Sequence, residues 1–97
     1  MARSGPADDG TVTEFKTLNE PTSTAIKDNI RLGTGQVLPH GNGHVVVDGR
    51  AAGLTEAVAR RGYARLAGER AAHGKPMPAE VTIILGDGRG LTWSSDV

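Results

Sequence analysis

A chain of 97 residues can form one domain around a single core, and its one Phe, one Tyr and one Trp leave that core to aliphatic side chains. Its 11 basic and 11 acidic residues balance, so the overall charge does not indicate a polyanionic partner. Without Cys there is no disulfide framework and no thiolate metal site, and the apolar runs are too short to span a bilayer.

The chain opens with small, polar and turn-forming residues. We expect residues 1–9 to form a poorly ordered arm, and Asp9-Gly10 is a hairpin signal that would pair this arm weakly with the next segment. No signal sequence follows Met1, so an exported form would travel as part of a larger protein.

Residues 11–18 form the first predicted strand. Glu14 and Lys16 lie two positions apart in it and should point to the same side. Such a pair is either a solvated ion pair or half of an active site. Together with Asp8 or Asp9, the pair would provide the side chains needed for metal-assisted phosphodiester hydrolysis, in which carboxylates hold the ion and a lysine assists the water.

The first predicted helix follows. Residues 22–24 (Thr-Ser-Thr) offer an N-cap for it, and it should end at Gly33 and Gly35. Lys27 and Arg31 lie one turn apart on it, and we expect them to form a short basic ridge.

Residues 44–48, HVVVD, are rich in β-branched side chains and predict a strand buried on both faces in the middle of a sheet. The strand ends at Asp48-Gly49-Arg50. These two charged side chains either face a substrate at the carboxyl edge or serve as a helix cap or loop ion pair. The histidines, His44 among them, show no metal-ligand spacing and are interpreted as loop and end residues.

The second half of the chain predicts a long helix over residues 54–74, a buried strand over 81–85, and a hairpin to a short closing strand over 91–93. Trp93 should seal the edge of the sheet. The order is β-α-β-α-β-β, which predicts an α/β fold: a small mixed sheet with parallel central strands and a short antiparallel edge.

Several blocks in this order, EFKTL, PTS, AIKDNIR, VVVDGRAAGLT and VTIILGDGRGLTW, carry a resemblance to a known family. From about Gly10 to Trp93 the chain resembles the tRNA-nuclease toxin domain at the C-terminus of contact-dependent growth inhibition proteins and related polymorphic toxins. The fold and active site of that domain belong to the PD-(D/E)xK nuclease group. The resemblance implies one nuclease-like domain over residues 1–97.

The resemblance also implies roles for particular residues. Glu14 and Lys16 would be catalytic, and Glu14 with Asp9 would hold Mg²⁺ or another divalent cation such as Mn²⁺ or Zn²⁺. The family's first aspartate would fall near Gly5, which carries no carboxylate, so Asp8 or Asp9 would take its place. The residues expected to contact the RNA are Thr17, Ser23, Lys27, Arg31 and Arg50.

The implied partners are tRNA and a cognate immunity protein, with the chain otherwise a monomer. The implied setting is a secreted or cell-surface protein that delivers this domain into the cytoplasm of a target cell. Two other functions stay open on the sequence: a DNA endonuclease that uses the same chemistry, and a catalytically inactive binding module that has kept the fold.

Overall fold

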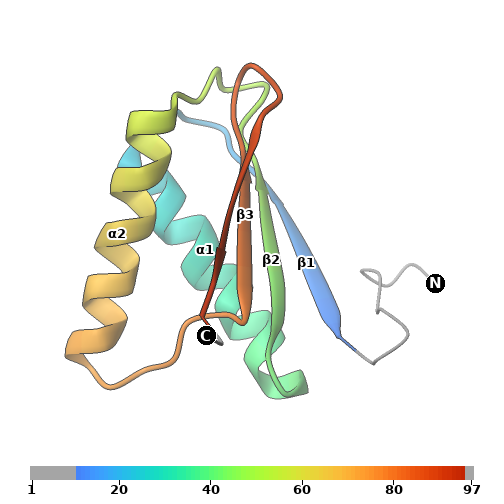
Figure 1. Cartoon of the computed structure of the whole chain (residues 1–97), viewed down its shortest axis with the longest axis vertical. Helices are drawn as coiled ribbons and strands as arrows, with labels where there is room; N and C mark the ends of the chain where they lie inside the picture. Colours follow the sequence, from blue (N-terminus) through green and yellow to red (C-terminus); the bar gives the residue numbers. More distant parts are fainter. Residues whose placement is uncertain (1–10, 96–97) are drawn as a thin grey trace.

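The computed structural model describes residues 11–95, which form one four-stranded sheet and two α-helices (Figure 1). The predicted order β-α-β-α-β-β and the α/β class are confirmed. The elements are strands β1 (Val12–Thr17), β2 (Gly43–Asp48), β3 (Glu80–Ile84) and β4 (Gly90–Ser94), helices α1 (Ser23–Val37) and α2 (Glu56–Ala72), and a 3-10 turn, η1 (Leu38–His40). Neither α-helix of this part of the chain is long and apolar enough to cross a membrane.

The strands lie in the sheet in chain order, β1-β2-β3-β4. The first three run parallel, and β4 pairs with β3 in the antiparallel direction, as the mixed-sheet prediction requires. In the central row of the sheet, Glu14, Val45, Val81 and Trp93 lie side by side. Both crossovers place their helix on the same side of the sheet, as Figure 1 shows.

Because both helices lie on one side, the strands alternate between covered and uncovered residues. In β2, Val45 and Val47 are fully buried beneath the helix layer, whereas His44, Val46 and Asp48 are only partly buried and point to the other side. The prediction that this strand is buried on both faces is therefore wrong. Its β-branched side chains suit a central strand, but no described helix covers the second face.

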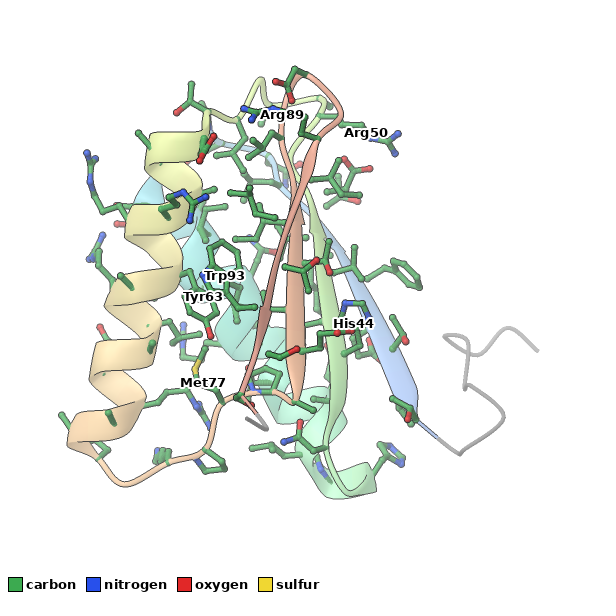
Figure 2. The ribbon with its side chains drawn as sticks, viewed as in Figure 1. His44, Arg50, Tyr63, Met77, Arg89 and Trp93 are labelled. Carbon is green, nitrogen blue, oxygen red and sulfur yellow. The ribbon has the colours of Figure 1, made fainter. Side chains whose placement is uncertain are left out.

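The core lies between the helices and the covered face. Its fully buried members come from α1, α2, β2, β3 and the adjoining loops, whereas β1 contributes only the partly buried Val12, and β4 the partly buried Leu91 and Trp93. The Trp93 ring stacks on Tyr63 of α2 with centroids 4.3 Å apart and planes 7° apart. Figure 2 shows this pair between α2 and the sheet, so Trp93 closes the edge of the core as expected.

Helix α1 begins as predicted, because the Thr22 hydroxyl accepts a hydrogen bond from the Ala25 amide at 3.1 Å. The prediction that it ends at Gly33 and Gly35 is wrong, since the helix continues to Val37. A Cβ at Gly33 would lie 2.7 Å from Val45 Cγ1, so this glycine lets the helix approach β2 instead of ending it.

A second close approach joins the two helices. A Cβ at Gly62 of α2 would lie 2.5 Å from Ile26 Cγ2 and 3.0 Å from the Ser23 carbonyl oxygen, both in α1. These distances are far below a normal contact of about 3.5–4.0 Å between carbon atoms. The backbone of α2 therefore packs directly on α1, and this packing fixes the spacing of the helix layer.

The connection from α1 to β2 turns at Asn42, which has a positive φ of 84°. Its side-chain oxygen accepts hydrogen bonds from the Gly43 amide at 2.7 Å and from the Ala79 amide at 2.8 Å. Its amide nitrogen donates to the Met77 carbonyl at 3.2 Å. One side chain thus ties the start of β2 to the segment that leads into β3.

Candidate functional site

Glu14 and Lys16 share one side of β1. Their register partners are Val45 and Val47, both buried under the helices, so the pair flanks α1 on the covered side of the sheet. Two residues along a strand separate the Cβ atoms by roughly 7 Å. Phe15, between them, points to the opposite side and is 65% exposed. The Lys16 ammonium forms no hydrogen bond or ion pair within the described chain, so it is available to a ligand.

The predicted cation site depends on residues at the beginning of the chain. Asp8 and Asp9 lie outside the described residues. Within residues 11–95 no three His, Asp or Glu side chains form a group that could hold a metal ion. Glu14 supplies one hard carboxylate of the kind that Mg²⁺ prefers, but one carboxylate from the protein falls short of a cation site. Of the two predicted metal ligands, Asp9 and Glu14, only Glu14 lies among the described residues.

The residues predicted on α1 face α2. Arg65 Nη1 donates to the Ser23 hydroxyl at 2.8 Å, and Lys27 Nζ donates to Glu69 Oε2 at 2.7 Å. The Lys27 side chain is only 18% exposed. The hydrogen bond from Lys27 is the largest cause that holds the pKa of Glu69 below its usual value. Lys27 therefore joins the two helices and is less accessible to a ligand than a surface lysine.

Arg31 lies further along the same helix, one turn beyond Lys27. Its only side-chain partner in the described part of the chain is Asp28, at 3.3 Å, in an exposed pair within α1. Exposed pairs of this kind contribute about 0–1 kcal/mol, so the guanidinium is easily drawn to another acid or to an anion.

Thr17 and Arg50 lie elsewhere, at the carboxyl ends of β1 and β2. Thr17 is exposed and pairs in register with Asp48. Arg50 donates to Asp48 through Nε at 3.0 Å and through Nη2 at 2.8 Å. Figure 2 shows Arg50 on the side of the sheet away from α2. The loop ion pair, one of the two predicted roles for these charges, is therefore formed, whereas Thr55 caps α2.

The Arg50 guanidinium has a clear electrostatic effect on Asp48. Its hydrogen bonds to the carboxylate are the main reason that the pKa of Asp48 falls from 3.8 to about 2. The five residues predicted to contact RNA thus form two separate groups. Thr17 and Arg50 lie at one end of the uncovered side, and Ser23, Lys27 and Arg31 lie in the helix layer.

His44 was interpreted as a loop or end residue, but it lies within β2 on the uncovered side of the sheet. Its Nε2 is 2.9 Å from Thr82 Oγ1, and its Nδ1 is 3.4 Å from the Glu80 carboxylate. Thr82 Oγ1 lies 2.9 Å from Thr92 Oγ1, which extends the polar row across β3 to β4. The alternation of side chains along β2 could have predicted the side of the sheet on which His44 lies. Its partners Glu80 and Thr82 could not be predicted in this way, because they are distant in sequence.

The sequence interpretation also missed a cavity of about 200 Å³ between the two helices. Helix α1 contributes Arg31 to it, and the last turns of α2 with the following segment contribute the other lining residues, namely Leu66, Glu69, Arg70, His73 and Lys75. Most of these side chains are cationic or can become so. The signal in the sequence was the excess of Arg and Lys over acids in both helices.

Comparisons with known proteins add nothing to this geometry. No protein-family model matches the sequence, and neither the curated proteins nor the solved structures give a match.

Proposed function

We propose that the chain is a metal-dependent endoribonuclease toxin that cleaves tRNA. In this proposal it is the C-terminal effector of a bacterial contact-dependent inhibition system, with a PD-(D/E)xK nuclease-like core. The observation that carries it is the placement of Glu14 and Lys16 together on one side of β1, flanking α1. The sequence blocks that resemble the toxin family supply the choice of substrate.

Each residue of the pair has a distinct role in this chemistry. Lys16 offers a point charge with no partner in the described chain, suited to neutralising the charge that builds up on a phosphate during cleavage. Glu14 and Asp9 would hold Mg²⁺, or Mn²⁺ or Zn²⁺. When bound, such an ion polarises the phosphate and makes a bound water more acidic. The proposal therefore needs Asp9, because the described residues provide only Glu14.

The same proposal names two partners, tRNA and a cognate immunity protein, for a domain that is otherwise monomeric. It also places the chain inside a larger protein, secreted or displayed at the cell surface, which delivers it to the cytoplasm of another cell. An immunity protein that covers Lys16 would block cleavage without entering the core.

The test compares Lys16→Ala with Arg61→Ala. Arg61 is an exposed cation of α2 that also lacks a partner within residues 11–95, so both variants remove one unpaired positive charge. Each protein is incubated with total tRNA and with plasmid DNA, with and without EDTA. Lys16→Ala should lower tRNA cleavage by roughly 100-fold or more, as the loss of one group that stabilises the transition state does elsewhere. Arg61→Ala should cleave like the wild type.

Stability provides the second measurement. Lys16 is half-buried and its ammonium has no partner within residues 11–95, so Lys16→Ala should lower the free energy of unfolding by no more than about 1 kcal/mol. Cleavage of tRNA by Lys16→Ala at the wild-type rate, or cleavage that persists in EDTA, contradicts the proposal. Cleavage of plasmid alone would transfer the function to a DNA endonuclease.

A further inference from the structure

The charges of this neutral chain are separated between its two layers. Helices α1 and α2 together carry six Lys or Arg and three Asp or Glu, whereas the four strands carry one Lys and three acids. A polyanion is therefore attracted more strongly to the helix layer than to the strands. The balanced total of 11 and 11 hides this asymmetry.

Within the helix layer, the positive charge is concentrated around the cavity between α1 and α2. Three cations line it, Arg31, Arg70 and Lys75, together with His73 and a single acid, Glu69. Glu69 is already neutralised by Lys27 at 2.7 Å, and Arg65 and Arg31 also lower its pKa through their charges. The cavity therefore keeps an excess of positive charge after its own acid is paired.

The cationic groups of the cavity also have spare hydrogen-bond donors. Arg70 uses Nε to donate to the Pro76 carbonyl at 2.6 Å, which fixes the side chain, and its two terminal nitrogens have no partner within residues 11–95. The Lys75 ammonium has no hydrogen bond or ion pair within the same residues. Arg31 has only the 3.3 Å contact with Asp28. These donors come from α1, from α2 and from the segment after α2, so they surround the cavity from several directions.

We propose that this cavity binds a phosphate group of an RNA backbone. The guanidinium groups of Arg31 and Arg70 match a phosphate in geometry, and Lys75 adds a point charge. This inference rests on the proposed function for the choice of RNA, but it assigns a binding site separate from Glu14 and Lys16. Glu69 opposes binding, because its carboxylate holds the Lys27 ammonium, which would otherwise add to the positive charge near the cavity.

The experiment measures the affinity of the whole chain for total tRNA and for a single-stranded RNA oligonucleotide. Every variant carries Lys16→Ala, and EDTA is present throughout, so no cleavage interferes. Lys75→Gln and Arg31→Gln should each weaken binding by roughly 3- to 10-fold at low salt. Each should also reduce the slope of log Kd against log salt by about 0.7–0.9, the value for one lost phosphate contact.

Two further variants make the test specific to the cavity. Arg61→Gln removes the same charge from α2 outside the cavity and should change the affinity by less than about twofold. Glu69→Gln removes the acid from the cavity and should strengthen binding several-fold, a change of the opposite sign. Urea unfolding of each variant excludes loss of structure as the cause.

Three results would overturn the site. One is an affinity and salt slope unchanged in Lys75→Gln and Arg31→Gln. Another is an equal loss in Arg61→Gln, which would mean that only the general charge of the helix layer matters. The third is displacement of the RNA by inorganic phosphate at a concentration equal to that of the RNA phosphates, which would identify a site for free phosphate.

The outcomes also separate this site from the proposed catalysis. If Lys16→Ala cleaves tRNA like the wild type while Lys75→Gln weakens binding, the catalytic proposal fails and the cavity stands. If Lys16→Ala abolishes cleavage while Lys75→Gln and Arg31→Gln leave the affinity for RNA unchanged, the catalytic proposal stands and the cavity fails.

Discussion

The close approach of the two helices at Gly62 gives the sharpest test of the fold, because one added methyl group there meets the buried Ile26 side chain and a backbone carbonyl. Gly62→Ala places a Cβ 2.5 Å from Ile26 Cγ2 and 3.0 Å from the Ser23 carbonyl oxygen. Overpacking a core in this way costs about 1–3 kcal/mol, and the upper part of that range applies when backbone is involved. Replacing glycine by alanine within a helix returns about 1 kcal/mol. We therefore expect Gly62→Ala to lower the free energy of unfolding by about 1–2 kcal/mol.

Gly68 provides a matched control in the same helix. It is exposed, and a Cβ built there has nothing within 4 Å, so Gly68→Ala should gain the helix propensity alone and stabilise the protein by about 0.5–1 kcal/mol. Urea unfolding followed by the fluorescence of Trp93 measures both variants. With a slope of about 1 kcal/mol per molar urea, the two midpoints should differ by roughly 2 M. Equal midpoints for the two variants would refute the direct packing of α2 on α1.

Two further predictions concern side chains at opposite ends of β2. The Asp48 carboxyl should titrate with a pKa of about 2 by NMR, and Arg50→Gln should return that pKa toward 3.8. Because the pKa is depressed in the folded state, the stability that this pair contributes is present above about pH 4 and is lost as the pH falls toward 2. An unchanged Asp48 pKa in Arg50→Gln would contradict the prediction. At the other end, Asn42→Gly removes three side-chain hydrogen bonds and should lower the free energy of unfolding by about 1–3 kcal/mol. Asn42→Ala should lower it further, because a Cβ is strained at the positive φ of this position. In urea unfolding, the Gly variant should therefore have a higher midpoint than the Ala variant.

The order and type of the elements could be predicted because they depend on local periodicity. Two errors arose where tertiary packing decides. Gly33 is typical of a helix end in the sequence, yet it lies within α1. A glycine is needed there because Val45 occupies the space that a side chain would fill. The β-branched run of β2 looks the same whether one or two layers cover the sheet, so the sequence could not show that its second face lacks a described helix.

The candidate site was predictable only in part, for a similar reason. That Glu14 and Lys16 point the same way follows from the period of a strand, and the structure places them together on β1. That Lys27 is held by Glu69, 42 positions away, depends on the packing of α2 on α1. The cavity that joins Arg31 to Lys75 depends on the same packing, so the sequence showed the excess of basic residues in the two helices but not where they meet.

The arrangement of strands in chain order has a consequence for how the protein is made. Each strand pairs with the next one to be synthesised, Val12 with Gly43, Val45 with Val81 and Val81 with Trp93. The sheet can therefore grow from its first strand to its last as the ribosome releases the chain, with no early strand waiting for a distant partner. Until β4 arrives, β3 presents an unpaired edge, whose backbone groups can pair with another chain.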